Sequence, residues 1–283
     1  MQAEHQKEEI SRLLADSDAA RLRTLAAEDG LSEAEVVGTA LAVYGQARKA
    51  PKLYGLGSEP AANGGPAAGV APDELQARSG DWGEFMVSSG WDAAYATGQA
   101  PWDIPRAQPA FVRIAQRGLL KGRVLDAGCG TGEVAMLAAA HGADAVGVDI
   151  SSQAIALARA KAARRGLNIR FEVASVFKLW NLNQTFDTIT DTGMFHIFND
   201  GERARYAASL ASVLVPGGLF YLECFSDTVP GDSGPRRVRR EEFAEVFKDG
   251  WTVVDVVQET LHVAPGATGN TTAPAWLATI RRV

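Results

Sequence analysis

Three glycines in the run VLDAGCGTGEVAML, residues 124–137, constrain the fold more than any other feature. Gly128, Gly130 and Gly132 follow an apolar run that ends at Asp126, and a helical stretch begins directly after them. Such a strand, turn and helix bring backbone N–H groups and a helix N-terminus to one edge of a sheet, where no Cβ obstructs a ligand. A tight turn without a ligand is the alternative interpretation.

Short runs rich in Val, Ile and Phe alternate with helical stretches on both sides of this turn. The alternation predicts a mostly parallel sheet covered on both faces, with an antiparallel terminal strand pair because no helix separates the last two runs. The fold class is therefore α/β. The expected strands are 124–127, 145–148, 169–173, 186–191, 219–225, 251–257 and 275–280, and the expected helices are 132–141, 152–165, 201–214 and 240–248.

Two carboxylates indicate what the turn binds. Asp149 ends the next strand, 21 residues after Gly128 (149 − 128), where a carboxylate can accept both hydroxyls of an adenosine ribose. Asp126 precedes Gly128 by two residues, and a negative charge there repels phosphate but suits an ammonium group. The G-x-G-x-G spacing also differs from that of dinucleotide sites. A ligand with a ribose at one end and an amino acid at the other is S-adenosylmethionine.

VLDAGCGTG followed by GVDIS resembles the cofactor signature of the class I S-adenosylmethionine-dependent methyltransferases. The resemblance implies their Rossmann-like sheet, their cofactor and methyltransferase activity. GWDAAYATGQAPWDIPRAQPAF is similar to the N-terminal lid of the thiopurine and thiol/halide methyltransferase group, and this likeness assigns Trp91, Tyr95 and Trp102 to the cofactor. Aromatic ring faces attract a sulfonium cation. Anchoring of a loop in the core is the alternative interpretation of these rings.

The remaining cofactor residues are expected at the ends of other strands. Ile150 follows Asp149, and Thr192 follows the fourth strand. After the third strand, these methyltransferases often carry an acid that binds the adenine amine, and Ser175 with Val176 stands there instead. We therefore expect Ser175 to accept that hydrogen bond weakly and Val176 to supply an apolar wall. No metal is expected.

Methyl transfer from a sulfonium is an in-line displacement, so an enzyme contributes mainly positioning in a dry pocket. Tyr95, Phe195 and His196 are the expected acceptor-binding residues, the last two because they follow the fourth strand. His196 is also the candidate general base, with an unperturbed pKa of about 6.5. A wall histidine bonded to backbone is the alternative for His196.

Composition suggests how the 283 residues are organised. A Gly/Pro-rich linker at 51–80 separates a helical extension, 1–50, from a methyltransferase domain, 81–283, with its lid at 81–118. The helix pair in 1–50 resembles that of ribbon-helix-helix DNA-binding domains. However, residues 1–80 hold 8 basic and 12 acidic side chains, which contributes −4 of the net −6 charge and argues against nucleic-acid binding. A homodimer through these helices is a further option.

The chain offers no apolar run of the roughly 18 residues that a membrane span needs. Two cysteines and an acidic N-terminal run, MQAEHQKEEISRLL, favour the cytoplasm. The sequence thus predicts methylation of an oxygen or sulfur nucleophile on a small molecule. Two alternatives remain open: a nicotinamide-dependent oxidoreductase, and a DNA-binding regulator with S-adenosylmethionine as its effector.

Overall fold

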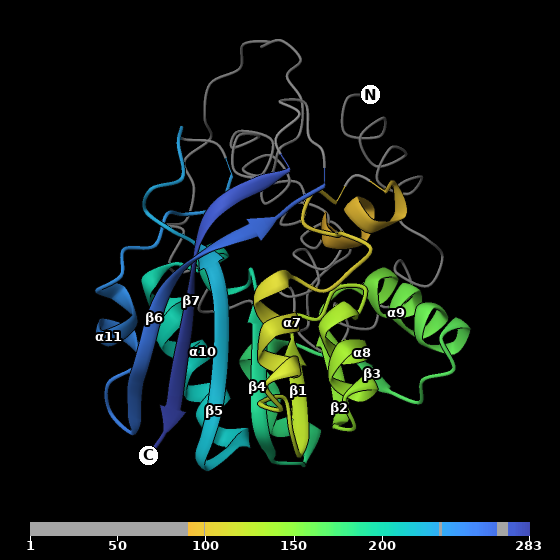
Figure 1. Ribbon diagram of the computed structural model, residues 1–283, viewed down its shortest axis with the longest axis horizontal. Helices are drawn as coiled ribbons and strands as arrows, with labels where there is room; N and C mark the ends of the chain where they lie inside the picture. The colour runs from red at the N-terminus through yellow and green to blue at the C-terminus, as the bar shows by residue number, and fades with distance from the viewer. Residues whose placement is uncertain (1–89, 99, 232–233, 265–270) are drawn as a thin grey trace, which may run out of the picture. The chain divides into compact units, whose positions relative to one another are not determined.

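A single sheet organises the computed structural model, which describes residues 90–98, 100–231, 234–264 and 271–283 (Figure 1). All of them belong to one compact unit, Val87–Val283. The predictions for residues 1–50, 51–80 and 81–89 lie outside the described residues. The strands are β1 (Arg123–Ala127), β2 (Asp144–Asp149), β3 (Arg170–Val173), β4 (Phe186–Thr192), β5 (Leu214–Phe225), β6 (Trp251–His262) and β7 (Thr272–Arg282).

The strand order is β3-β2-β1-β4-β5-β7-β6. The first five strands pair in parallel, and β7 is antiparallel to both β5 and β6. This confirms the predicted Rossmann-like sheet with its antiparallel terminal pair. Because parallel strands share a direction, β1 to β5 all end at the same edge, and that edge is where α/β proteins bind ligands.

The helices are α7 (Pro109–Gln116), α8 (Glu133–Ala140), α9 (Ser152–Arg164), α10 (Asp200–Val213) and α11 (Glu242–Val246), with 3-10 turns η1 (Val176–Leu182) and η2 (Phe195–Ile197). α7 falls within the predicted lid and was not expected as a helix. Its buried residues Phe111, Ile114 and Ala115 follow the 3–4 residue spacing of one helix face, and Pro109 stands at its first turn, where no N–H is needed.

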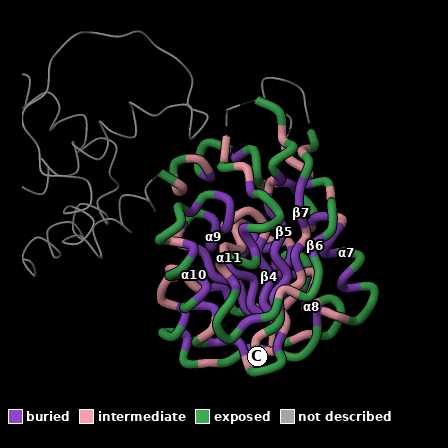
Figure 2. Tube along the Cα trace, turned by 90° about the vertical axis from the view of Figure 1, so that its left-hand side faces the viewer, coloured by how far each residue is buried: buried purple, intermediate pink, exposed green. Residues whose placement is uncertain are grey.

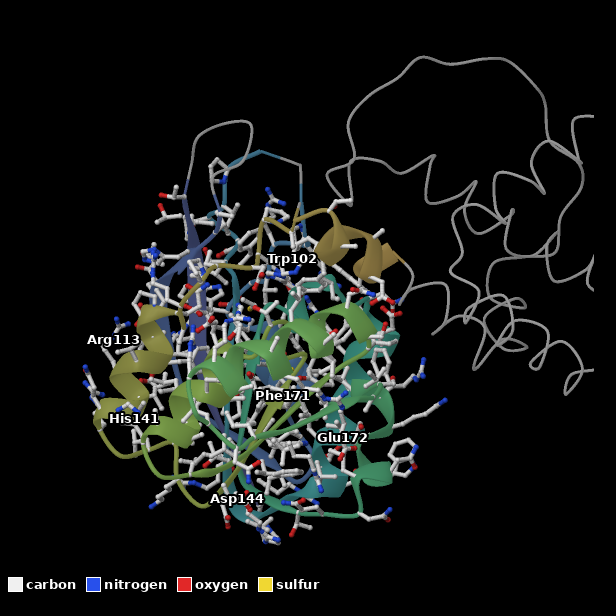
Figure 3. The ribbon with its side chains drawn as sticks, turned by 90° about the vertical axis from the view of Figure 1, so that its right-hand side faces the viewer. Trp102, Arg113, His141, Asp144, Phe171 and Glu172 are labelled. Atoms are coloured by element: carbon white, nitrogen blue, oxygen red, sulfur yellow. The ribbon has the colours of Figure 1, made fainter. Side chains whose placement is uncertain are left out.

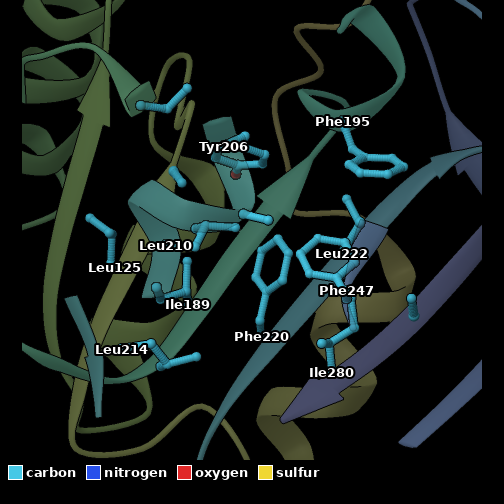
Figure 4. Packing of buried hydrophobic residues seen from close by; sticks show 14 of the residues in the cluster. Leu125, Ile189, Phe195, Tyr206, Leu210, Leu214, Phe220, Leu222, Phe247 and Ile280 are labelled. Carbon is cyan, nitrogen blue, oxygen red and sulfur yellow. The ribbon is translucent and has the colours of Figure 1, made fainter. Parts of the chain in front are cut away.

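Apolar side chains cover both faces of the sheet. One cluster joins α10, α11 and η1 to β4 and β5 through residues such as Ile189, Tyr206 and Phe220 (Figure 4). A second joins α7 and α8 to Val124 and Tyr221 on the opposite face. Buried positions consequently concentrate along the central strands (Figure 2). Continuous burial of this kind is characteristic of parallel strands and explains their unbroken Val, Ile and Leu runs.

Candidate active site

The loop between β1 and α8 passes so close to two side chains that its glycines leave no room for a Cβ. A Cβ at Gly128 would lie 2.2 Å from Cγ of Met194, and one at Gly130 would lie 2.8 Å from the Tyr95 hydroxyl. Both glycines have positive φ, 69° and 51°, which L side chains rarely adopt. The loop therefore presents bare backbone, as the sequence predicted for a ligand-binding turn.

Asp149 ends β2 and lies against this loop. Its Oδ2 accepts a hydrogen bond from Gly130 N at 2.8 Å, and its Oδ1 accepts one from Ser151 N at 2.9 Å. Burial raises the pKa of Asp149 to about 6, while the two N–H groups oppose that rise. The Ile150 N–H also opposes the rise. A carboxylate offers about four lone-pair sites, so Asp149 can hold the loop and still accept a hydrogen bond from a ribose hydroxyl.

Asp126 has an internal role that the sequence did not indicate. Its Oδ2 accepts from Ala135 N in the first turn of α8 at 3.0 Å, and its Oδ1 accepts from the Thr190 hydroxyl on β4 at 3.0 Å. The residue is 2% exposed, and burial raises its pKa to about 7. Asp126 therefore ties β1, α8 and β4 together behind the loop. Its contact with an ammonium group remains a prediction.

The three aromatic residues predicted to bind cofactor form one cluster. Trp102 meets Trp91 edge-to-face with ring centroids 5.0 Å apart, and it meets Tyr95 in the same way at 6.1 Å. Trp102 Nε1 also donates to the Tyr95 hydroxyl at 2.9 Å. Figure 3 shows Trp102 at the end of the molecule opposite Asp144, where β2 begins, so the cluster lies at the carboxyl edge of the sheet.

The sequence did not single out Asp92, which fastens the segment 90–108 to α9. We call residues 90–108 the lid segment. Asp92 Oδ1 accepts from the Ser151 hydroxyl at 2.5 Å and from Gln153 N at 3.1 Å, and its Oδ2 accepts from the Ser152 hydroxyl at 3.1 Å. A carboxylate at a helix N-terminus satisfies N–H groups that have no partner within the helix.

Asp103 was also missed, and it fastens the lid segment to the glycine loop. Its carboxylate accepts from the Thr131 hydroxyl, and Lys161 Nζ donates to the same hydroxyl at 2.5 Å. Asp103 belongs to the PWD run that suggested the lid, but only Trp102 was assigned a role from that run. The side chain that was passed over carries the direct link to the loop.

The other end of the lid segment is fastened to β6. Gln108 Nε2 donates to the His262 carbonyl at 2.8 Å, while Gln108 Oε1 accepts from His262 N at 2.8 Å. Ala264 N donates to the Pro101 carbonyl at 2.7 Å. The lid segment thus links the glycine loop, which follows β1, to the end of β6, and β4, β5 and β7 lie between these two strands in the sheet order.

The residues expected near adenine lie together at the edge. Ile150 and Ser175 follow the paired strands β2 and β3, and Ala174 N donates to the Asp149 carbonyl at 2.9 Å. The Ser175 hydroxyl accepts from Phe177 N at 3.3 Å and so caps η1. Val176 is 5% exposed and packs in the core cluster around β4, which leaves little of it to form an adenine wall.

His196 is 5% exposed and does not have the environment of a general base. Its Nδ1 accepts from Phe225 N at 2.9 Å, which places the proton of the neutral ring on Nε2. Burial lowers the pKa of His196 to about 3, helped by the positive charges of Arg203 and Arg237. A base needs a free lone pair, whereas the remaining nitrogen of His196 is a donor. We therefore no longer assign His196 that role.

Phe195 belongs to the core. It is fully buried, stacks on Phe243 and Phe247 with centroids 5.7 and 5.8 Å away, and lies 4.2 Å beneath the Arg203 guanidinium carbon (Figure 4). Placement after β4 was a sound reason to expect it at the edge, but the η2 turn directs its ring inward. We withdraw Phe195 from the acceptor pocket.

Thr192, the last residue of β4, lies at the edge as predicted. Its hydroxyl oxygen is buried and, within the described part of the chain, has no hydrogen-bond partner. A hollow of about 490 Å³ lies elsewhere, beside the β6–β7 pair. None of the predicted site residues lines it; its lining is Ser226, Thr228, Gln258, Glu259, Thr260, Thr272, Pro274 and Ala275.

The described residues contain no group of three His, Cys, Asp or Glu side chains arranged to hold a metal ion. They also contain no helix that is long and apolar enough to cross a membrane.

Fold and site together define an α/β protein that presents a bare glycine loop, a ribose-competent carboxylate and an aromatic lid segment at one sheet edge. Residues 124–218 match the methyltransferase domain family. The chain is 34% identical over 165 residues to 2-heptyl-1-hydroxyquinolin-4(1H)-one methyltransferase of Mycobacteroides abscessus. The matched region covers 57% of this chain and 73% of that relative. It is 29% identical over 181 residues to probable thiol methyltransferase 2 of Arabidopsis thaliana, covering 63% and 80%.

Solved structures agree with these relatives. A structure from work on the conversion of a disulfide bond into a thioacetal group during echinomycin biosynthesis is 32% identical, with a TM-score of 0.63, covering 69% of this chain and 92% of the other. The Burkholderia thailandensis 1,6-didemethyltoxoflavin-N1-methyltransferase, solved with S-adenosylhomocysteine, shares the fold at 22% identity and a TM-score of 0.55, covering 77% and 93%. The chain belongs to the S-adenosylmethionine-dependent methyltransferases. Its cofactor is S-adenosylmethionine, and the oxidoreductase alternative is excluded.

Proposed function

We propose that this enzyme transfers a methyl group to an oxygen or sulfur nucleophile of a small molecule. The lid segment carries the proposal, because it is fastened at Asp103 to the glycine loop and at Gln108 to β6. An acceptor that reaches the ends of β4 and β5 has to fit beneath that segment, which favours a small molecule over a polymer. The names of two relatives support the nucleophile, since one contains a hydroxyquinolinone and the other a thiol.

The residues present fit the cofactor. Gly128 and Gly130 let the loop backbone approach Met194 and Tyr95 more closely than any residue with a Cβ could, and Asp149 stands beside the loop with a lone pair to spare. When bound, S-adenosylmethionine supplies an activated methyl group on a sulfonium. We propose that Asp149 binds the ribose, that Ile150, Ser175 and Val176 border the adenine, and that Asp126, Gly128, Gly130 and Thr192 surround the methionine part.

The lid segment has a second proposed task, which is to exclude water. Trp91, Tyr95 and Trp102 place three rings over the loop, where ring faces favour a cation by about 0.5 to 2 kcal/mol. Tyr95 also borders the acceptor in this proposal. In-line displacement proceeds fastest when donor and acceptor are held within contact distance in a dry site. The chain's own contribution is therefore mostly positional.

A methyl-transfer screen across thiols, phenols, hydroxyquinolines and halides tests the proposal. We expect methylated products from thiols or hydroxyl compounds and none from duplex DNA offered in the same assay. Product from halides alone would overturn the assignment to oxygen or sulfur. Retention of the chain on DNA at low salt, lost on deleting residues 1–50, would instead support the DNA-binding alternative.

The remaining proposals concern organisation. We propose a methyltransferase domain at 81–283 with its lid at 81–118, a linker at 51–80 and a helical extension at 1–50 that is free to form a homodimer. A cytoplasmic location is proposed because Cys129 and Cys224 are free thiols, as expected in a reducing compartment.

A further inference from the structure

Two polar side chains on the neighbouring strands β4 and β5 have no hydrogen-bond partner among the described residues. Both carboxylate oxygens of Glu223 and the hydroxyl oxygen of Thr192 are buried and unpaired, and Glu223 is fully buried. Leaving a buried polar group unpaired costs about 1 to 3 kcal/mol, and more for a charge. Such a group calls for a partner from outside the chain.

Glu223 and Thr192 are neighbours in the sheet. They are register partners on the parallel strands β5 and β4, so their side chains leave the same face, about 5 Å apart. That face is the one covered by α7, because Tyr221, two residues before Glu223 on β5, packs in the α7 cluster. The two groups do not bond to each other, so both keep their hydrogen-bonding capacity for a donor from a ligand.

Their position favours the acceptor over the cofactor. Going outward from the glycine loop, the sheet order places β4 first and β5 second. Asp126 and Thr190 already form a bonded pair on the cofactor side, at the junction of β1 and β4. Glu223 lies one strand further out, between β4 and β7, on the face that α7 covers.

We propose that Glu223 is a catalytic residue that receives the proton of a hydroxyl acceptor, while the Thr192 hydroxyl orients the same oxygen. The inference rests on the proposed methyl transfer to a small molecule. In this step the acceptor's O–H bond breaks and its proton goes to the Glu223 carboxylate. The oxygen forms the new bond to the methyl carbon, the bond from that carbon to sulfur breaks, and its electron pair stays on sulfur as a neutral thioether. The proton leaves Glu223 for water after product release.

The charges around Glu223 fit this task. Burial raises its pKa to about 8, the carboxylate of Glu259 on β6 raises it further, and the guanidinium of Arg113 on α7 lowers it. From β4 it meets the uncharged Thr192, and from β7 its register partner is the apolar Leu277. A base with a pKa near the working pH transfers protons most effectively.

The first test is Glu223→Gln, which keeps the shape and removes the proton acceptor. We expect turnover of a phenol or hydroxyquinoline to fall at least about 100-fold, as is typical for loss of a general base. Turnover of thiophenol should stay within about twofold, since a thiolate needs no base. Binding of S-adenosylmethionine by calorimetry should be unchanged. Glu172→Gln, which removes a partly exposed carboxylate on β3, is the matched control.

The second test changes the pH dependence of turnover through a substitution at a residue other than Glu223. Glu259→Gln removes the charge that raises the pKa of Glu223 and frees Arg113 from its ion pair with Glu259. The rising limb of turnover against pH for the hydroxyl acceptor should therefore shift to lower pH. Thr192→Val should raise the KM for that acceptor and leave the limb in place. A merely structural carboxyl would give neither result.

The outcomes distinguish a wrong role for Glu223 from a wrong proposed function. Equal turnover of hydroxyl acceptors by Glu223→Gln and the wild type, or methylation of thiols with none of hydroxyls, overturns the inference and leaves the proposed function standing. Failure of the wild type to methylate any thiol, hydroxyl compound or halide, despite cofactor binding, overturns both. If Glu223→Gln does not fold, the pH dependence of turnover in Glu259→Gln is the deciding measurement. A rise in turnover at the same pH as in the wild type then overturns the inference.

Discussion

At the scale of single residues, buried carboxyls set the electrostatics of the active site. Burial raises the pKa of Asp149 to about 6, of Asp126 and Asp191 to about 7, and of Glu223 to about 8. Hydrogen bonds from the backbone or a hydroxyl oppose the rise at the three aspartates, whereas Glu223 has no such bond among the described residues. The carboxylate of Glu259 raises the pKa of Glu223 further.

These carboxyls make stability depend on pH in a definite direction. Each folded-state pKa lies above its unfolded value, so the folded chain keeps protons that the unfolded chain has lost. Their stabilising contribution is complete below about pH 4 and is lost as the pH rises through 6 to 8. We expect the free energy of unfolding in urea to be lower at pH 8.5 than at pH 5.5 by at least about 1.4 kcal/mol, the value of one pKa unit.

Glu223→Gln provides the control for that measurement. Because glutamine does not titrate, the variant should lose less stability between the two pH values than the wild type. A wild-type stability that increases toward pH 8.5, or an identical slope in both proteins, would contradict the assignment of raised pKa values to these sites.

Asp149 gives the sharpest residue-scale test of the cofactor site. Asp149→Ala removes the oxygen pair that we propose binds the ribose, and it also releases Gly130 N and Ser151 N. We expect affinity for S-adenosylmethionine to fall at least about 10-fold by calorimetry, because bonds to a charged group are worth about 1.5 to 3 kcal/mol. Asp144→Ala, which removes an exposed aspartate from the other end of β2, is the matched control. Unchanged affinity in Asp149→Ala would show that the ribose binds elsewhere.

At the scale of elements, the lid segment is held by contacts at both ends, and the Gln108 contact is the cleanest to remove. Gln108 is 4% exposed and bonds both backbone groups of His262. Gln108→Ala should cost about 1 to 3 kcal/mol of stability. It should also speed hydrogen exchange at residues 100–108 and raise the KM for the acceptor.

Gln153→Ala is the comparison for the Gln108 variant. The Gln153 side chain is exposed, and its backbone N–H, which bonds Asp92, is kept by alanine. Exchange rates at 100–108 that are the same in both variants would mean that the lid segment does not depend on its anchor at β6.

Local sequence patterns predicted the elements better than the contacts between them. β1 to β4 lie within one residue of their expected bounds, because unbroken Val, Ile and Phe runs mark strands covered on both faces. β5 begins at Leu214 instead of residue 219, since its first residues, LVPGG, carry turn signals. The link from Gln108 to His262 spans 154 residues, and no local pattern can reveal it.

In the candidate site, too, local motifs could be predicted from the sequence and contacts between distant residues could not. The glycine loop, Asp149 and the three lid rings could be predicted, because each belongs to a short motif with its own chemistry. The environments of His196 and Phe195 could not, because they depend on Phe225, Phe243 and Phe247, which follow much later in the chain. Glu223 was missed because the lack of hydrogen-bond partners for its carboxylate can be seen only once its neighbours in the folded chain are known.

At the scale of the whole molecule, all the residues that build the site lie after residue 86, in the compact unit Val87–Val283. A chain that starts at residue 81 should therefore bind S-adenosylmethionine with an affinity within about threefold of the full chain. A saturating cofactor should raise the melting temperature of both, because a ligand that binds only the native state stabilises it. Loss of binding on truncation would show that residues 1–80 complete the site.

Two of the contacts that fasten the lid segment have a kinetic consequence. Asp103 bonds the glycine loop, where we propose that the cofactor binds, and Gln108 bonds β6 at the far side of the proposed acceptor site. In this proposal a single element covers both ligands. Spent cofactor and methylated product cannot then leave through independent exits. We expect an ordered sequence of arrivals and departures, with release rather than bond formation limiting each cycle.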